Sequence, residues 1–365
     1  MTTSIPAQMS GVYLTGHGDV DKLEYRDDIP VPEPSAGEIL IRVAAAGMNN
    51  TDINTRVGWY AKSVRGTTNA TAENLEDNEG GSWSGDAMQF PRIQGLDCCG
   101  YIVAVGDGVD ASRVGERVLV RAMQDRHDPA NPYAFDTFGS EVDGAFAQYT
   151  KTGSTQALRV DCDWSDVELA TIPCACTTAE GMLTRGGVGA DRVLITGASG
   201  GVGSAAVQLA KRRGAEVIGI AAQAKAGGVM ALGADRVVHR GLSLLDEPGP
   251  QSVDVIIDLV GGAQWPELLE VLKTGGRYVT SGAIAGPIVE LDLRTLYLRD
   301  LTLYGSTYTD DSIFASVVRY IENGEVRPVV GGTYPLKDIA LAQQDFLTKR
   351  HTGNLVLLPP QPDPD

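Results

Sequence analysis

The stretch VLITGASGGVGSAAVQLAKRRGAEVIGI, residues 193–220, decides the fold of the second half of this chain. An apolar strand ends at Ile195, a glycine-rich turn follows, and a helix over 201–213 leads into a second apolar strand over 215–222. Glycines in such a turn let a pyrophosphate approach the backbone, and the helix N-terminus supplies N–H groups and positive dipole. The stretch therefore predicts a dinucleotide-binding turn, the alternative being a tight turn that binds nothing.

The spacing of small residues in this turn is a variant of G-x-G-x-x-G in which alanine replaces the first glycine. The second glycine is expected to let the backbone approach the pyrophosphate, and the third to let the helix pack closely on the sheet. The fingerprint positions are Ala198, Gly200 and Gly203, and the predicted phosphate-binding residues are Ala198, Ser199, Gly200, Gly201, Val202 and Gly203.

Apolar strands alternate with helical segments through the middle third of the chain. Nearly continuous apolar strands of this kind are typical of a parallel sheet covered on both faces, and right-handed crossovers make the sheet doubly wound. We therefore predict an α/β fold. Strands are expected at 191–197, 215–222, 235–239, 253–260, 276–282 and 301–307, and helices at 201–213, 226–232 and 266–272.

The end of the second strand indicates which dinucleotide binds. Folds that prefer NAD place Asp or Glu there for the ribose 2′-hydroxyl, whereas residues 221–223 are Ala-Ala-Gln. No carboxylate at this place repels a 2′-phosphate, so the sequence predicts NADP(H); a solvated surface lysine is the alternative for Lys225. The cofactor-binding residues expected at this edge of the sheet are Ala222, Lys225, His239 and Arg240.

The first third of the chain contains short β-rich runs with turn signals between them, which predict a barrel-like β domain. Residues 61–90 are polar and lack a sustained period, as in a lid or a disordered connection. Trp83, Met88 and Phe90 favour a segment that docks on the protein. The expected strands are at 38–44, 100–106 and 116–122.

The last part of the chain is expected to hold two helices, over 311–323 and 336–349, and an apolar strand over 353–358. The tail over 359–365 reads PPQPDPD, in which proline removes backbone donors, so we expect it to be disordered.

Length and composition exclude several classes of protein. The chain has 365 residues, which fits two domains. Its net charge of -17 and its lack of a basic run argue against nucleic-acid binding. No apolar run reaches the roughly 20 residues of a membrane span, and no signal peptide is expected. Because 5 cysteines are too sparse for a disulfide framework, we expect a cytoplasmic protein.

Three motifs in this order carry a resemblance: IQGLDCCGYIVAVG (93–106), IPCACTTAEGML (172–183) and GASGGVG (197–203). The chain resembles the medium-chain dehydrogenase/reductase superfamily, which includes zinc alcohol dehydrogenases, quinone oxidoreductases and enoyl reductases. The resemblance implies two domains with the active site in the cleft between them. These are a GroES-like β-barrel catalytic domain over 1–165 with an insertion at 61–90, to which 309–365 return, and a Rossmann domain over 166–308.

The residues that hold catalytic zinc in one branch of that superfamily are largely missing here. Asn49 stands three residues before Asp52 where that branch has Cys, and Leu96 stands where it has His. Only Cys174, four residues before Thr178, remains. Leucine cannot ligate a metal and an amide is a poor zinc ligand, so we predict no catalytic zinc.

The other cysteines do not restore a metal site. Cys98 and Cys99 are adjacent, so in a strand their side chains point to opposite faces. We interpret them, with Cys162 and Cys176, as small buried residues. The family's structural zinc lobe carries four close cysteines, whereas residues 121–144 contain none.

The segment NNTDINTRVGWY (49–60) is similar to the zinc-free branch, with Asn50 in place of its usual proline. The resemblance implies that Asn49 lies at the edge of the substrate or nicotinamide and that Asp52 is a buried support. It places Tyr60 where some enoyl reductases keep a proton-donating tyrosine; a core or surface aromatic is the alternative. The candidate catalytic residues are Tyr60, Asn49 and Arg56, where Arg56 has a surface salt bridge as its alternative.

Three further residues are expected to face the nicotinamide. The resemblance places Thr178 at a helix start, in the family's nicotinamide-facing motif. Gly282 and Ala283 follow the fifth strand of the Rossmann domain, whose C-terminal end borders the ligand.

We predict an NADPH-dependent reductase of quinones or activated alkenes that acts without zinc. Hydride goes to the β-carbon of an enone, a proton to the α-carbon or oxygen, and hydrogen-bond donors stabilise the enolate. An alcohol or aldehyde dehydrogenase and a non-catalytic NADPH-binding protein are the alternatives. The expected partners are a small-molecule substrate and a second copy, with 301–307 as the pairing edge of a homodimer.

Overall fold

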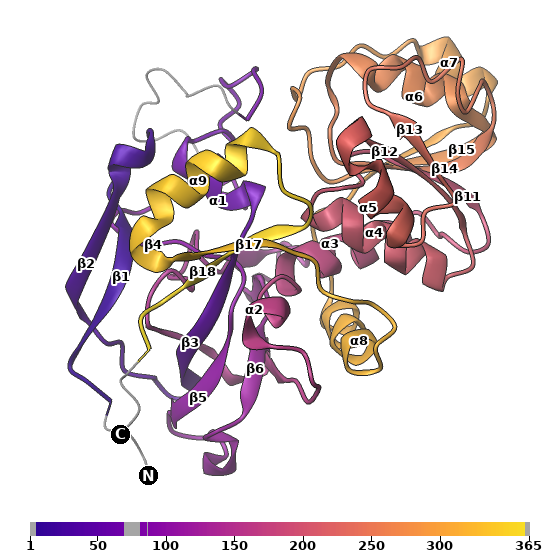
Figure 1. The fold of residues 1–365 in the computed structure, drawn as a ribbon. Helices are drawn as coiled ribbons and strands as arrows, with labels where there is room; N and C mark the ends of the chain where they lie inside the picture. Colours follow the sequence, from indigo (N-terminus) through magenta and orange to yellow (C-terminus); the bar gives the residue numbers. More distant parts are fainter. Residues whose placement is uncertain (1–4, 69–80, 86, 362–365) are drawn as a thin grey trace. The chain divides into compact units, whose positions relative to one another are not determined.

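The computed structural model describes residues 5–68, 81–85 and 87–361 (Figure 1). The chain forms two compact units. Unit 1 comprises Met1–Val64, Thr71–Cys174 and Pro328–Asp365, and unit 2 comprises Arg65–Ala70 and Ala175–Arg327.

These units divide later in the chain than the expected boundaries at 165 and 308. Asp166 stays with unit 1 because it accepts a hydrogen bond from the Tyr101 hydroxyl at 3.2 Å. The segment after residue 308 stays with unit 2, where the backbone N–H of Arg327 donates to Gln208 Oε1 at 3.0 Å and Glu325 pairs with Arg212. Side-chain contacts of this kind do not appear in a strand–helix pattern.

Unit 2 contains a sheet of six parallel strands. The order reverses direction between β11 and β14, and in doubly wound sheets ligands bind at the carboxyl ends of strands at that reversal. The expected doubly wound α/β fold is confirmed. In spatial order the strands are β13 (Arg236–His239), β12 (Glu216–Ala221), β11 (Arg192–Ile195), β14 (Val253–Asp258), β15 (Leu272–Thr280) and β16 (Thr302–Gly305).

Helices cover both faces of this sheet, with α4 and α5 on one side and α6 and α7 on the other (Figure 1). Leu268 and Leu269 of α6 are buried with Ile218 and Ile256 of the strands, and this packing fixes the helix on its face. The helices of this part are α3 (Pro173–Arg185), α4 (Gly201–Arg212), α5 (Ala226–Ala231), α6 (Trp265–Val271), α7 (Leu293–Leu298) and α8 (Asp311–Glu322).

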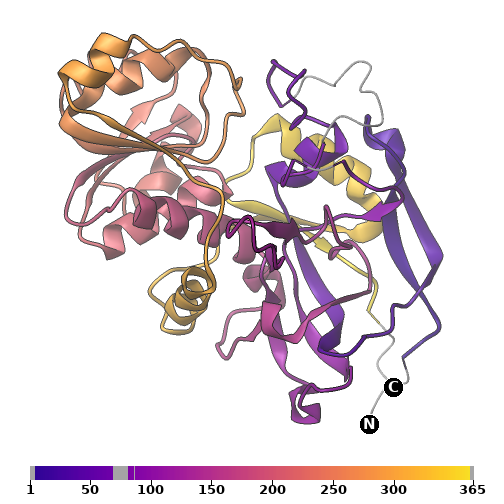
Figure 2. The same ribbon diagram turned by 180° about the vertical axis from the view of Figure 1, so that it is seen from behind.

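Unit 1 is built around one long strand, β3 (Glu38–Met48), which pairs with β5, β9 and β18. Leu355 of β18 lies opposite Met48, so the C-terminal segment completes the N-terminal sheet, as the yellow and indigo ribbons show (Figures 1 and 2). The other strands are β1 (Gln8–Leu14), β2 (Leu23–Pro30), β4 (Arg92–Ile93), β5 (Cys99–Val105), β6 (Arg117–Val120), β7 (Met123–Asp125), β8 (Phe135–Thr137), β9 (Tyr149–Gly153), β10 (Ala157–Arg159), β17 (Val330–Pro335) and β18 (Asn354–Leu358).

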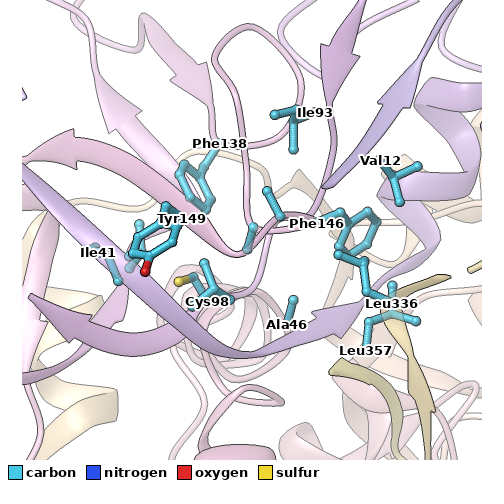
Figure 3. Packing of buried hydrophobic residues seen from close by; sticks show 14 of the residues in the cluster. Val12, Ile41, Ala46, Ile93, Cys98, Phe138, Phe146, Tyr149, Leu336 and Leu357 are labelled. Atoms are coloured by element: carbon cyan, nitrogen blue, oxygen red, sulfur yellow. The ribbon is translucent and has the colours of Figure 1, made fainter. Parts of the chain in front are cut away.

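The core of unit 1 lies between these sheets and contains Phe138 and Phe146, both fully buried (Figure 3). Cys98 is part of this core, whereas the neighbouring Cys99 turns its thiol towards Asp166 at 3.8 Å. The two thiols therefore occupy different surroundings, as expected for adjacent residues of an extended segment.

Three helices complete the described part of unit 1, and the sequence patterns predict only the last of them. The helices are α1 (Asn50–Arg56), α2 (Asp166–Leu169) and α9 (Ile339–Thr348), and short 3-10 turns lie at Val20–Lys22, Ala111–Arg113, Ser154–Gln156 and Leu336–Asp338, with two more in unit 2 at Gln223–Lys225 and Gly262–Gln264. Within the described ranges, no helix is long and apolar enough to cross a membrane.

The end of the 61–90 segment docks on unit 1, as its apolar residues predict. Met88 is buried, the ring of Phe90 meets His17 edge-on at 4.9 Å, and Trp83 meets Phe135 at 5.9 Å. The predicted lid or disorder over 69–80 lies outside the described residues.

The prediction of a disordered tail is wrong for residues 359–361. The side-chain amide of Gln361 donates to the Val43 carbonyl at 3.0 Å, and that of Gln148 donates to the Pro360 carbonyl at 2.8 Å. Glutamine side chains thus hold a proline-rich backbone that cannot join a strand ladder. Residues 362–365 lie outside the described range.

Candidate active site

The phosphate-binding turn between β11 and α4 is shaped by two glycines. Gly197 has φ +60°, a left-handed conformation that favours glycine. A Cβ on Gly203 would lie 2.1 Å from the Gly197 carbonyl oxygen, so only glycine fits there. The expected close packing at Gly203 therefore has a definite steric cause.

The helix α4 begins without a side-chain cap, because its N-cap residue is Gly200. A Cβ on Gly200 would meet no atom closer than 3.5 Å, so the fold itself does not require glycine there. The first N–H groups of any helix lack intrahelical partners, and here Ser199, Gly201 and Val202 surround them. This helix start fits an anionic phosphate group.

The sequence reasoning missed Gly197. It named Ala198 as the first fingerprint position, and Ala198 is buried with its N–H bonded to the Ile220 carbonyl at 3.1 Å. The conformation of the turn instead depends on the preceding glycine. A search of the sequence for a glycine one place earlier would have found it.

The residues expected to distinguish NADP(H) from NAD lie together at the ends of β12 and β13. Ala221 and His239 are register partners, and the Arg240 N–H donates to the Ala221 carbonyl at 2.8 Å. Burial lowers the pKa of Lys225, and the charge of Arg240 lowers it further. Two cations are therefore close to one another beside Ala222.

Asp258, which the sequence reasoning did not single out, ties together the carboxyl ends of three strands. Its buried carboxylate accepts hydrogen bonds from Thr196 Oγ1 at 2.6 Å and from the Tyr278 hydroxyl at 2.5 Å. It also accepts from the N–H groups of Val260 and Gly261 at 2.9 and 3.2 Å. These bonds fix the backbone at the reversal of strand order.

The loop after β15 packs against this fixed backbone. A Cβ on Gly282 would lie 3.0 Å from the Leu259 carbonyl oxygen, and Ala283 lies beside Gly261. Thr178 is half-buried inside α3, which begins at Pro173, so the prediction that Thr178 starts a helix is wrong. Proline is favoured at the first position of a helix, so the helix begins earlier in the chain than Thr178, at Pro173.

In unit 1, Asn49 stands at the centre of a buried polar cluster. Its backbone N–H donates to Asp52 Oδ2 at 2.7 Å, and its side-chain amide donates to Asp97 Oδ2 at 2.8 Å. Asn354 donates to its amide oxygen at 3.5 Å, and the Cys174 N–H donates to Asp97 Oδ1 at 2.6 Å. Asn49 therefore links two carboxyl groups, Asp52 through its backbone N–H and Asp97 through its side-chain amide.

Burial dominates the ionisation of these two acids. It raises the pKa of Asp52 to about 8, although the N–H of Asn49 opposes the shift and the charge of Asp97 adds to it. It raises the pKa of Asp97 to about 7 against the hydrogen bonds from Asn49 and Cys174. Asp52 matches its expected role as a buried support.

The Tyr60 side chain is half-buried, with its hydroxyl 3.4 Å from Thr51 Oγ1 and 3.3 Å from Asn54 Nδ2. Burial raises the pKa of Tyr60 to about 12, and the nearby Cys174 and Asp52 contribute to that rise. The phenol is therefore protonated at neutral pH, which suits a hydrogen-bond donor and not a base.

Arg56 is 1% exposed and its guanidinium is occupied by structural partners. It donates to Gln343 Oε1 at 2.7 Å and to the Gly18 carbonyl at 2.6 Å, and it lies 3.5 Å from Asp19. These contacts join α1 to α9 and to the turn before β2. They do not support a catalytic role. The alternative, a salt bridge, is present, because the guanidinium pairs with Asp19, whose side chain is 78% exposed, although Arg56 itself is buried.

The place of the catalytic metal in the zinc branch is lined by groups that do not fit zinc. Cys174 packs in an apolar cluster with Leu96 and Ala122, against which Trp83 rests. One thiolate beside leucine, alanine and tryptophan does not supply the three or four N, S or O ligands that zinc takes. No group of three or more His, Cys, Asp or Glu side chains suited to a metal occurs in the described part of the chain.

Two family profiles match this chain. The alcohol dehydrogenase GroES-like domain matches residues 35–161, and the zinc-binding dehydrogenase profile matches residues 201–323.

Known proteins are similar over nearly the whole length. A crystal structure of a candidate alcohol dehydrogenase from Sinorhizobium meliloti 1021 is 44% identical, with a TM-score of 0.86 and 98% of both chains covered. The acryloyl-coenzyme A reductase of Metallosphaera sedula is 28% identical over 96% of this chain and 99% of that protein. The quinone oxidoreductase of Rattus norvegicus is 27% identical over 96% of this chain and 98% of that protein.

The chain belongs to the medium-chain dehydrogenase/reductase superfamily. It is an oxidoreductase of that superfamily, whose members use nicotinamide cofactors, and unit 1 carries its GroES-like domain. The zinc in the name of one matching profile has no matching ligand set among Asn49, Leu96 and Cys174.

Proposed function

We propose that this protein is an NADPH-dependent reductase of quinones or carbonyl-conjugated alkenes and that it acts without zinc. The observation that carries the proposal is the half-buried Tyr60 hydroxyl, hydrogen-bonded to Thr51 and Asn54, in a unit where Leu96 and Cys174 form an apolar cluster in place of a metal site. A hydroxyl donor stabilises a developing enolate without a metal ion. The names of the acryloyl-coenzyme A reductase and quinone oxidoreductase relatives support both substrate classes.

The residues of this chain have separable tasks in such a reaction. The nicotinamide, when bound, supplies the hydride that reaches the β-carbon of the alkene. Asn54 Nδ2 donates to the Tyr60 phenol oxygen at 3.3 Å and holds it in place. The phenol proton, which Tyr60 otherwise donates to Thr51 Oγ1 at 3.4 Å, turns to the carbonyl oxygen of the substrate and passes to the enolate, and solvent then reprotonates the tyrosinate. A quinone needs less help because its reduced form is a stable phenolate.

The cofactor preference follows from the edge formed by β12 and β13. Lys225 and Arg240 are close enough for Arg240 to lower the pKa of Lys225. A 2′-phosphate placed between two cations neutralises their mutual repulsion, and the neutral residues Ala221 and Ala222 do not oppose it. These features support NADP(H) over NAD(H).

We further propose that the protein forms a homodimer through the edge of the unit 2 sheet. The strand β16 is the last in the strand order, so one side of its backbone lacks a strand partner in the described sheet. Beside it in sequence, Leu293, Tyr297 and Leu298 of α7 are 63%, 62% and 67% exposed. Sheet edges and apolar patches of this kind are usually covered in native proteins. Light scattering should give twice the chain mass, and a monomer would contradict this proposal.

The substitution Tyr60→Phe tests the role of the phenol. We expect kcat for an enone such as methyl vinyl ketone to fall by about 100-fold, the usual contribution of a positioned proton donor. Reduction of a quinone should change by less than about threefold. If kcat of Tyr60→Phe equals that of the wild type with both acceptors, Tyr60 takes no part in the chemistry and quinone reduction remains as the function.

A further inference from the structure

The end of the 61–90 segment is anchored to unit 1 by the half-buried carboxylate of Glu141. Glu141 Oε1 accepts from Ser84 Oγ at 2.5 Å and from the Ser84 N–H at 3.3 Å, while Oε2 accepts from the Thr137 N–H at 2.7 Å. Burial alone would raise the pKa of Glu141, but hydrogen bonds from Ser82, Ser84 and Thr137 outweigh burial and lower it. An ionised carboxylate thus holds both serines that flank Trp83.

The anchored residue Trp83 reaches the candidate substrate site. Its indole meets the ring of Phe135 edge-on at 5.9 Å and packs on the cluster of Leu96, Ala122 and Cys174. The Cys174 N–H and the side-chain amide of Asn49 donate to the same Asp97 carboxyl group. Asn49 is the N-cap of α1, and Thr51 of that helix accepts a hydrogen bond from the Tyr60 hydroxyl. The indole and the phenol therefore both pack on residues joined through the Asn49–Asp97 pair.

Both aromatic side chains keep part of their surface accessible. Trp83 and Tyr60 are half-buried, whereas Leu96 is fully buried and Cys174 nearly so. An acceptor bound over Leu96 and Cys174 would meet the accessible part of the indole. Flat π-systems interact with indole rings beyond simple area burial.

We propose that Trp83 is a specificity-determining residue that selects planar, conjugated acceptors, and that Glu141 is the positioning residue that presents it. The inference rests on the proposed function. It adds a substrate preference for extended flat acceptors over small enones.

The test compares 1,4-naphthoquinone with methyl vinyl ketone, using the full-length protein and NADPH. For Trp83→Ala we expect kcat/KM for naphthoquinone to fall about tenfold, as for a lost aromatic contact, and kcat/KM for methyl vinyl ketone to stay within about twofold. Trp83→Phe should fall between Trp83→Ala and the wild type. Trp164→Ala, which removes another half-buried tryptophan of unit 1, is the matched control and should leave the ratio unchanged.

Glu141→Gln tests the positioning role. It keeps the shape of the side chain but weakens the bonds to Ser82 and Ser84, so it should raise KM for naphthoquinone with little change in kcat. Equal losses for both acceptors in Trp83→Ala, in a protein of unchanged melting temperature, would overturn the inference. If Trp83→Ala fails to fold, Trp83→Phe replaces it in the comparison. An unchanged ratio of kcat/KM for naphthoquinone to kcat/KM for methyl vinyl ketone in Trp83→Phe would then overturn the inference.

A binding measurement separates this inference from the proposed function. Calorimetric titration of naphthoquinone in the presence of NADP⁺ requires no turnover. Wild-type protein that binds naphthoquinone but oxidises no NADPH would contradict the proposed function, and the Kd of Trp83→Ala would still test Trp83. A Kd about tenfold higher supports the inference, and an equal Kd refutes it.

Discussion

The helix starts of α4, in unit 2, and of α1, in unit 1, differ in chemistry. The helix α4 begins at Gly200 without a side-chain cap, beside glycines whose backbone is exposed to an incoming group. The helix α1 begins at Asn49, whose N–H already donates to Asp52. The start of α4 is a bare helix start, because its N–H groups have no side-chain partner among the described residues and can receive a phosphate. The start of α1 is a closed helix start, because the carboxyl group of Asp52 already accepts from the Asn49 N–H.

The largest effect is expected at the bare helix start. Gly203→Ala places a methyl group 2.1 Å from the Gly197 carbonyl oxygen and forces the turn apart. We expect an overpacking cost of roughly 1–3 kcal/mol in the free energy of unfolding and a loss of NADPH affinity of about 100-fold or more. Thermal unfolding and a fluorescence titration with NADPH measure both.

Gly200→Ala is the matched control, because its methyl group meets nothing closer than 3.5 Å. It should keep the melting temperature of the wild type and lose NADPH affinity only, since Gly200 is needed for the ligand and not for the fold. Unchanged NADPH affinity in this variant would mean that the phosphates do not lie over Gly200.

The edge that carries Lys225 and Arg240 should give an intermediate effect. We expect each alanine substitution to raise Kd for NADPH by about tenfold, the value of one charge-assisted contact, while Kd for NADH changes little. The two cations act on one phosphate, so their effects should not add. A uniform loss for both cofactors would show that these residues do not recognise the 2′-phosphate.

The closed helix start should show a smaller, pH-dependent effect. Because burial raises the pKa of Asp52 from 3.8 to about 8, the folded protein holds a proton that the unfolded chain releases above pH 3.8. The contribution of this proton to the free energy of unfolding is full below pH 3.8 and is lost as pH rises towards 8. Asp52→Asn, which mimics the protonated acid, should gain several degrees in melting temperature relative to the wild type between pH 5 and 8. A difference in melting temperature between Asp52→Asn and the wild type that does not change with pH would contradict a buried, protonated Asp52.

The glycine turn and the strands of unit 2 could be predicted from the sequence, whereas the polar contacts around Asn49 could not. Gly203 was identifiable because a backbone clash depends on local spacing, and the six strands of unit 2 followed from apolar periodicity. The link from Asn49 to Asp97, the bonds of Asp258 to Thr196 and Tyr278, and the anchor of Ser84 on Glu141 were not, because these partners lie many residues apart; Asn49 and Asp97 are 48 apart. Local patterns determine the cofactor turn, whereas tertiary contacts determine the substrate side.

Steady-state NADPH oxidation with an enone and a quinone decides whether this protein reduces acceptors with NADPH and without zinc. We expect turnover with at least one acceptor, an unchanged rate after treatment with EDTA, and kcat/KM for NADPH about tenfold or more above that for NADH. Loss of activity on chelation that zinc restores, together with alcohol oxidation in place of acceptor reduction, would contradict the claim.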